Sequence, residues 1–97
     1  MHILTHDWKF HSQRLGKFYK DGSKAGIQAR HATRIRLILA QLNQAEKITD
    51  MNVPSLKLHE LKGNRTGDWA VTVQTNWRIT FRFKEGNAEH VHYEDYH

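Results

Sequence analysis

The chain has 97 residues, the length of one small domain with a small hydrophobic core. Fifteen Lys and Arg against ten Asp and Glu give a net charge of +5 and an isoelectric point near 9.8, which favours an anionic partner, with nucleic acid as the leading candidate. A hydrophobic content of 38% argues against disorder, and the absence of cysteine excludes disulfides and thiolate chemistry. The longest aliphatic run, residues 37–40, is too short for a membrane span. We therefore expect one soluble, cytoplasmic domain over residues 1–97.

The N-terminal half has helical periodicity. Spacings of three and four connect Trp8, His11, Leu15, Phe18 and Tyr19, which predicts an amphipathic helix that ends near residues 21–22. A second helix is expected over residues 27–45, and the residues that share its apolar face are Ile35, Ile38, Leu39 and Leu42. Together these patterns predict a helical hairpin.

Three arginines, Arg30, Arg34 and Arg36, lie on the second predicted helix outside its apolar face. The simpler interpretation is a solvated helix face. The alternative is a contact with an RNA backbone or a protein partner. The sequence leaves both interpretations open.

After Pro54 the period of the pattern changes from helical to alternating. Residues 69–74 and 77–83 each alternate apolar and polar side chains, as half-buried strands do, and residues 74–76 are short enough for a hairpin turn. Residues 85–87 supply the next turn before a last strand near residues 89–94. Residues 62–67 form a polar loop bounded by glycines.

These elements predict an α+β fold, in which two N-terminal helices pack on one face of a small antiparallel sheet of three or four strands. If Trp77, Ile79 and Phe81 face the helices, then Arg78, Thr80 and Arg82 lie on the open face of the sheet. The C-terminal strand can then reach Arg78.

A set of basic and proton-transfer residues is expected to converge on that open face. The expected catalytic residues are His59, Lys62, Arg78, Asp95, Tyr96 and His97, and the expected RNA-binding residues are Arg65, Asn76, Arg82 and His92. RNA cleavage suits such a set, because the 2′-OH attacks the adjacent phosphate and the protein supplies only a base, an acid and cations for the transition state. Arginine can bond two phosphate oxygens at once, whereas lysine acts as a point charge.

A metal site at the C-terminus is the competing interpretation. His90, His92 and His97 lie near two carboxylates, but their spacing matches no known metal motif. We expect neither a metal nor another cofactor.

Four segments resemble one known family. They are LHELKG at residues 58–63, WAVTV at residues 69–73, NWRITF at residues 76–81, and YEDYH at residues 93–97. In this order they resemble the HigB toxins of the RelE/ParE superfamily, the toxins of bacterial type II toxin–antitoxin systems. The motif match covers about residues 56–97, whereas the helical half agrees in layout only.

The resemblance implies a RelE-like microbial ribonuclease fold and a toxin that cuts mRNA in the A site of the 30S ribosomal subunit, which inhibits translation and growth. It also implies a helix-turn-helix antitoxin of the HigA kind, through which alone the complex contacts operator DNA.

The family's functional positions carry over as implied roles. Lys62 and Arg78 stabilise the transition state, His97 or Asp95 deprotonates the 2′-OH, and Tyr96 orients a base or phosphate. His59 is the other proton-transfer candidate. The products are a 2′,3′-cyclic phosphate and a 5′-OH.

Two other functions remain open at the level of sequence. Members of the superfamily related to ParE poison DNA gyrase, so that a shared fold does not determine the target. A non-enzymatic RNA-binding module needs only the basic charge and exposed aromatic rings. The catalytic ending at residues 95–97 favours the ribonuclease.

Overall fold

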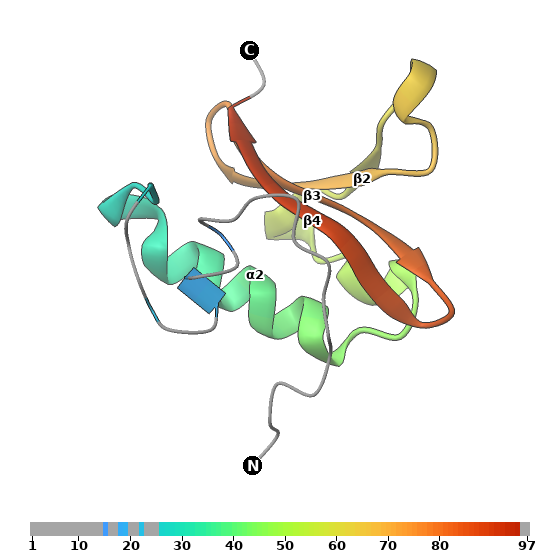
Figure 1. Cartoon of the computed structure of the whole chain (residues 1–97), viewed down its shortest axis with the longest axis horizontal. Coiled ribbons are helices and arrows are strands. Elements are labelled where there is room, and N and C mark those ends of the chain that lie inside the picture. The colour runs from blue at the N-terminus through green and yellow to red at the C-terminus, as the bar shows by residue number, and fades with distance from the viewer. Residues whose placement is uncertain (1–14, 16–17, 20–21, 23–25, 96–97) are drawn as a thin grey trace.

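A computed structural model describes residues 26–95 together with Leu15, Phe18, Tyr19 and Gly22. Within these residues the chain forms one α-helix, α2 (Ala32–Gln44), and four strands, which are β1 (His59–Glu60), β2 (Trp69–Gln74), β3 (Trp77–Lys84) and β4 (Asn87–Asp95). Short 3-10 turns, η1 (Ala29–His31), η2 (Ile48–Met51), η3 (Pro54–Leu56) and η4 (Gly63–Arg65), connect them. In Figure 1, α2 lies across one face of the sheet and leaves the other face open.

The helix α2 is built around the predicted apolar face. Ile35, Ile38, Leu39 and Leu42 are all buried, which confirms the helical periodicity of this segment. The helix begins five residues later than predicted, because residues 29–31 form the tighter turn η1 and the N-cap residue offers no side-chain cap. At the other end, helical bonding stops at Ala45, whose backbone N–H still donates to Gln41 O at 3.0 Å.

Only part of the first predicted helix falls on described residues. Leu15, Phe18 and Tyr19 have helical backbone, Leu15 and Phe18 are buried in the core, and Gly22 N–H donates to Phe18 O at 2.9 Å. The remainder of this prediction, including Trp8 and His11, lies outside the described residues. The observed layer that covers the sheet is therefore one complete helix, α2, and the pair of N-terminal helices is not confirmed.

The sheet is an antiparallel meander with the strand order β1-β2-β3-β4. Its last turn is a two-residue connection in which Glu85 (φ 54°) and Gly86 (φ 81°) both have positive φ, as the tight hairpin turns of twisted strands require. Strand β4 starts two residues earlier than predicted because Asn87 pairs with Lys84 directly after this turn. It also contains a bulge opposite Phe81, where the register shifts between Thr80 and Arg82.

The hydrophobic core lies between α2 and one face of the sheet. Val71, Ile79, Phe81 and Val91 from three strands are fully or almost fully buried there. Thr80 departs from the prediction: it belongs to the opposite face, as expected, but it is only 2% exposed. Among the described residues, no helix has the length and apolar character that crossing a bilayer requires.

Candidate functional site: a charged open face

The strand register aligns side chains in rows across the open face of the sheet. One row follows the paired residues of four strands, from His59 through Ala70 and Thr80 to His92. The next row contains Thr72, Arg78 and Glu94. Directly opposite residues in an antiparallel sheet share a face, so that Arg78 and Glu94 are neighbours by construction.

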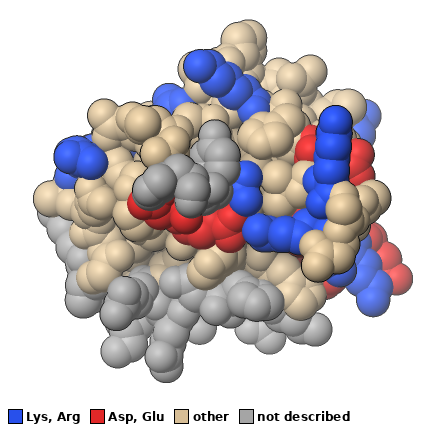
Figure 2. Space-filling model, turned by 90° about the horizontal axis from the view of Figure 1, so that it is seen from above, with Lys and Arg blue, Asp and Glu red and all other residues tan. Residues whose placement is uncertain are grey.

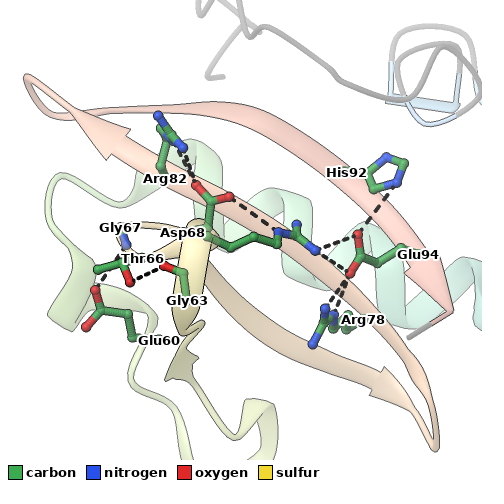
Figure 3. A network of polar contacts seen from close by, with 10 residues as sticks. Glu60, Gly63, Thr66, Gly67, Asp68, Arg78, Arg82, His92 and Glu94 are labelled. Atoms are coloured by element: carbon green, nitrogen blue, oxygen red, sulfur yellow. Dashed lines mark hydrogen bonds and ion pairs between the residues drawn. The ribbon is translucent and has the colours of Figure 1, made fainter. Parts of the chain in front are cut away.

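Three arginines and two carboxylates form an alternating series of ion pairs on this face, most of whose members are labelled in Figure 3. Arg78 donates to Glu94 Oε2 from Nε at 2.8 Å and from Nη2 at 2.5 Å. Arg65 Nη1 lies 3.0 Å from the same oxygen, and its Nε lies 3.7 Å from Asp68 Oδ2. Arg82 Nε donates to Asp68 Oδ1 at 2.8 Å. Each carboxylate therefore bridges two guanidinium groups, and we call these five residues the arginine–carboxylate chain.

Glu94 is the acid that joins Arg65 and Arg78 in this chain. Its side chain is 17% exposed and that of Arg78 is 12% exposed. Burial by itself raises the pKa of Glu94, but hydrogen bonds and charge from Arg65 and Arg78 outweigh burial and hold the pKa below its usual value. Glu94 is therefore an ionised acceptor at neutral pH.

The arginine–carboxylate chain changes the electrostatics that the sequence led us to expect on this face. The sequence predicted basic and proton-transfer residues on this face, whereas the space-filling view shows basic and acidic side chains side by side (Figure 2). With three guanidiniums and two carboxylates, the arginine–carboxylate chain has a net charge of +1. The surface still favours an anion, but its cations are held by built-in acceptors.

A hollow of about 420 Å³ lies on the same face. Its lining residues are Arg65, Asp68, Thr80, Arg82, His90, His92 and Glu94. At its rim, His90 has a φ of 55° within the bulge of β4, a left-handed conformation that is uncommon for residues other than glycine. The hollow thus joins the predicted RNA-binding residues Arg65, Arg82 and His92 in one depression.

Two of the predicted catalytic residues, both of them exposed, lie at or near the edge of the sheet that β1 forms. Lys62 is exposed and occupies the position directly before η4, where its side chain makes no capping hydrogen bond. His59 is exposed on the edge strand β1, where its Nδ1 lies 3.0 Å from Lys57 O. Both belong to the loop and edge that flank Arg65.

The C-terminal residues divide between the two faces. Asp95 pairs with Trp77 in the register, one position beyond Glu94, so that the pleat puts it on the face opposite to Arg78. Asn76 is half-buried in the turn between β2 and β3. The predicted residues Tyr96 and His97 lie outside the described residues.

A second polar cluster, missed by the sequence reasoning, lies where β4 meets the start of α2. His31 is 1% exposed, and its Nδ1 lies 2.7 Å from the hydroxyl of Tyr93. The ring of Tyr93 stacks on Trp77 with centroids 4.6 Å apart. Burial lowers the pKa of His31, with a smaller contribution from the nearby positive charge of Arg30, although a hydrogen bond with Gln74 opposes this. The cluster therefore contains a neutral imidazole that ties the helix to the sheet.

The carboxylates of the arginine–carboxylate chain were also missed by the sequence reasoning. In the sequence, Glu94 was only one of the two carboxylates near the C-terminal histidines that could form a metal site, and nothing indicated Asp68. Strand alternation offered a signal for Glu94, since a hairpin that pairs residue 78 with residue 94 puts their side chains together. This signal could not be used from the sequence, because it requires the strand register to be known. Among the described residues, no group of three or more His, Asp or Glu side chains has the arrangement of a metal site.

A model of the family described as "RelE-like toxin of type II toxin-antitoxin system HigB" matches residues 8–97. The chain belongs to this family of toxins. A curated relative from Proteus vulgaris, named Endoribonuclease HigB, is 41% identical over 88 residues, which are 91% of this chain and 96% of that protein. The family assignment confirms the resemblance seen in the sequence motifs.

Solved structures support the fold of this HigB-like chain. The crystal structure of YafQ from E. coli strain BL21(DE3) has a TM-score of 0.56 at 14% identity, covering 93% of this chain and 92% of that chain. A point mutant of YafQ from E. coli, in which a histidine is replaced by glutamine, has a TM-score of 0.51 at 15% identity with the same coverage. At such low identity, the likeness concerns the architecture of a helix on an antiparallel sheet.

Proposed function

We propose that this HigB-like toxin is an endoribonuclease that cuts mRNA in the ribosomal A site and thereby stops translation and growth. The observation that carries the proposal is Arg78, which hydrogen bonds to Glu94 fix on the open face of the sheet, where Glu94 lines a hollow of about 420 Å³. The Proteus vulgaris relative, which is 41% identical to this toxin, is named an endoribonuclease, and this name supports the same reaction here.

The proposed reaction needs no metal or covalent intermediate. A base takes the proton of the 2′-OH, the 2′ oxygen forms a bond to the adjacent phosphorus, and the bond from phosphorus to the 5′ oxygen breaks. An acid returns a proton to that 5′ oxygen. The products are a 2′,3′-cyclic phosphate and a 5′-OH, so that atoms and charge balance without a co-reactant.

The cationic groups act on the negative charge that develops on the phosphate oxygens. Arg78 contributes a guanidinium whose fork can bond two phosphate oxygens, and Lys62 adds a point charge from the loop. Arg65, Arg82, Asn76 and His92 contact the RNA around the scissile linkage. His97 serves as the base, His59 is the other proton-transfer group, and Tyr96 orients a base or phosphate. Asp95 has no part in this step, because the pleat puts it on the face opposite to Arg78.

The partners follow from the family. A type II toxin has a cognate antitoxin, and we propose that this antitoxin is a helix-turn-helix protein of the HigA kind, which also supplies the contact with operator DNA. The toxin acts in the cytoplasm, where its mRNA and ribosome targets are found. The whole chain, residues 1–97, acts as a single toxin domain.

The test compares Arg78→Ala with wild-type toxin on translated mRNA. New 5′ ends mapped by primer extension are expected with the wild type, and the loss of one well-aimed donor should reduce cleavage by about 10²–10³-fold. The matched control is Arg36→Ala, since Arg36 is exposed on α2 and lies on the other layer of the fold. It should cleave like the wild type.

Two outcomes would overturn the proposal. If the wild-type toxin arrests growth but produces no new 5′ ends, and instead inhibits supercoiling by gyrase, the ParE-like function is correct. If it binds RNA without arrest or cleavage, it is a binding module. Equal cleavage by Arg78→Ala and the wild type would refute the role of Arg78.

A further inference from the structure

Glu94 presents a problem for an RNA-binding face. A carboxylate beside the cations repels the phosphate that they are to bind, and so weakens RNA affinity. Its side chain is nevertheless enclosed among them, at 17% exposure, and uses both oxygens within 3.4 Å of Arg65. An acid in this position calls for a role that offsets the lost affinity.

The contact geometry supplies that role. Arg78 offers Glu94 the fork formed by Nε and Nη2, and Nη1 takes no part in this contact. A side-on fork determines the plane of the guanidinium and therefore the direction of its other edge. A long arginine side chain without such a partner samples many rotamers, and ordering it at the moment of reaction costs free energy.

Glu94 also brings Arg65 and Arg78 together. Both guanidiniums lie within 3.0 Å of its Oε2 atom. Two like charges so close repel each other unless a carboxylate lies between them. Arg65 comes from the loop after β1 and Arg78 from β3, so that Glu94 on β4 joins three separate segments of the chain.

We propose that Glu94 is a positioning residue that holds Arg78 in the orientation in which it stabilises the transition state of RNA cleavage, and that keeps Arg65 beside it where Arg65 contacts the RNA. This inference rests on the proposed ribonuclease function. Glu94 lowers the affinity for RNA and raises the cleavage rate. Asp68 contributes indirectly: it pairs with Arg65, and Arg65 in turn pairs with the Glu94 carboxylate that holds Arg78.

The opposed signs of the two effects define the kinetic test. Glu94→Gln keeps the size of the side chain and removes its charge. We expect cleavage on saturating programmed ribosomes to slow by about 10–100-fold, the scale for a misplaced catalytic group, while binding stays equal or becomes tighter. Glu94→Asp, which keeps the charge and loses one methylene, should retain more of the rate than Glu94→Gln.

A matched control separates charge from position. Glu46→Gln makes the same chemical change at an exposed residue beyond the end of α2, outside the arginine–carboxylate chain. It raises the net charge equally and should leave the cleavage rate unchanged. If both glutamine variants behave alike, the effect is one of net charge and the positioning role is refuted.

A second readout does not depend on activity. In wild-type toxin the Nε–H groups of Arg78 and Arg82 each donate to a carboxylate, so that both should give dispersed, slowly exchanging NMR signals. In Glu94→Gln the Arg78 signal should move and exchange faster, whereas the Arg82 signal, held by Asp68, should stay and report an intact fold.

The outcomes distinguish this inference from the proposed function. If the wild type does not cleave RNA, the proposed function and this role in it fail together. If the wild type cleaves and Glu94→Gln cleaves at the same maximal rate, only the role of Glu94 is overturned. A variant that loses affinity as much as rate also overturns it, because that result makes Glu94 an RNA contact or a support of the fold.

Discussion

Replacing Tyr93 by Phe removes one hydroxyl from a buried polar contact between helix and sheet. Tyr93 is 7% exposed, His31 is 1% exposed, and the hydroxyl lies 2.7 Å from Nδ1 of His31. Without it, the imidazole nitrogen is left in the interior without this partner, which costs about 1–3 kcal/mol of unfolding free energy. The stack on Trp77, with centroids 4.6 Å apart, survives because the ring is unchanged.

The measurement is the free energy of unfolding in urea, with thermal unfolding as a second readout. For a domain of this size each kcal/mol lowers the melting temperature by about 4–8 °C. The matched control is Tyr19→Phe, since the Tyr19 hydroxyl is part-buried and donates to Asn43 Oδ1 at 3.2 Å. It should lose about 0.5–1.5 kcal/mol. A Tyr93→Phe protein as stable as the wild type would show that the pair with His31 does not secure the fold.

Two further predictions concern the same layer. Arg34→Ala removes two hydrogen bonds from Nη2 to the backbone carbonyls of η3 and β2, at 2.5 and 3.2 Å, and should lower the unfolding free energy by about 1.5–3 kcal/mol. Arg36→Ala loses the contact of its guanidinium with the Phe18 ring, 5.3 Å from the ring centroid, and should lower the unfolding free energy by about 0.5–1 kcal/mol. Equal losses in the two variants would contradict this ranking. Because burial lowers the pKa of His31 in the folded state, the unfolded chain binds the proton first as the pH falls through 6.5, and stability decreases from there down to the folded pKa. In urea unfolding across a pH series, the unfolding free energy of His31→Gln should therefore fall less steeply with decreasing pH than that of the wild type. The same pH dependence in both proteins would count against the buried neutral imidazole.

The Glu94 carboxyl contributes to stability with its own pH window. Its pKa is lowered in the folded state, so that its contribution is complete above the ordinary value of 4.5 and is lost as the pH falls through the folded pKa. This loss begins at a lower pH than that of His31, which begins near 6.5. The two groups therefore start to affect the acid unfolding curve at different points.

Local patterns in the sequence determined the elements of this fold. The period of two in residues 69–83 and the 3.6-residue period around Ile35 and Leu42 arise from the geometry of one strand or one helix, so they can be read without the rest of the molecule. The same patterns put Arg78 and Arg82 on the face away from the core. The motifs of the C-terminal half also indicated the toxin family, which the family model and the Proteus vulgaris relative confirm.

Only the tertiary structure decided which charges meet. A strand pattern tells which face a side chain takes but not which residue lies opposite, because pairing depends on turn length and bulges. The pairing of β3 with β4 put Glu94 against Arg78, and the loop before β2 added Arg65 and Asp68. The same register separated Asp95 from Arg78, and the packing of α2 on the sheet brought His31 to Tyr93 across 62 positions of sequence.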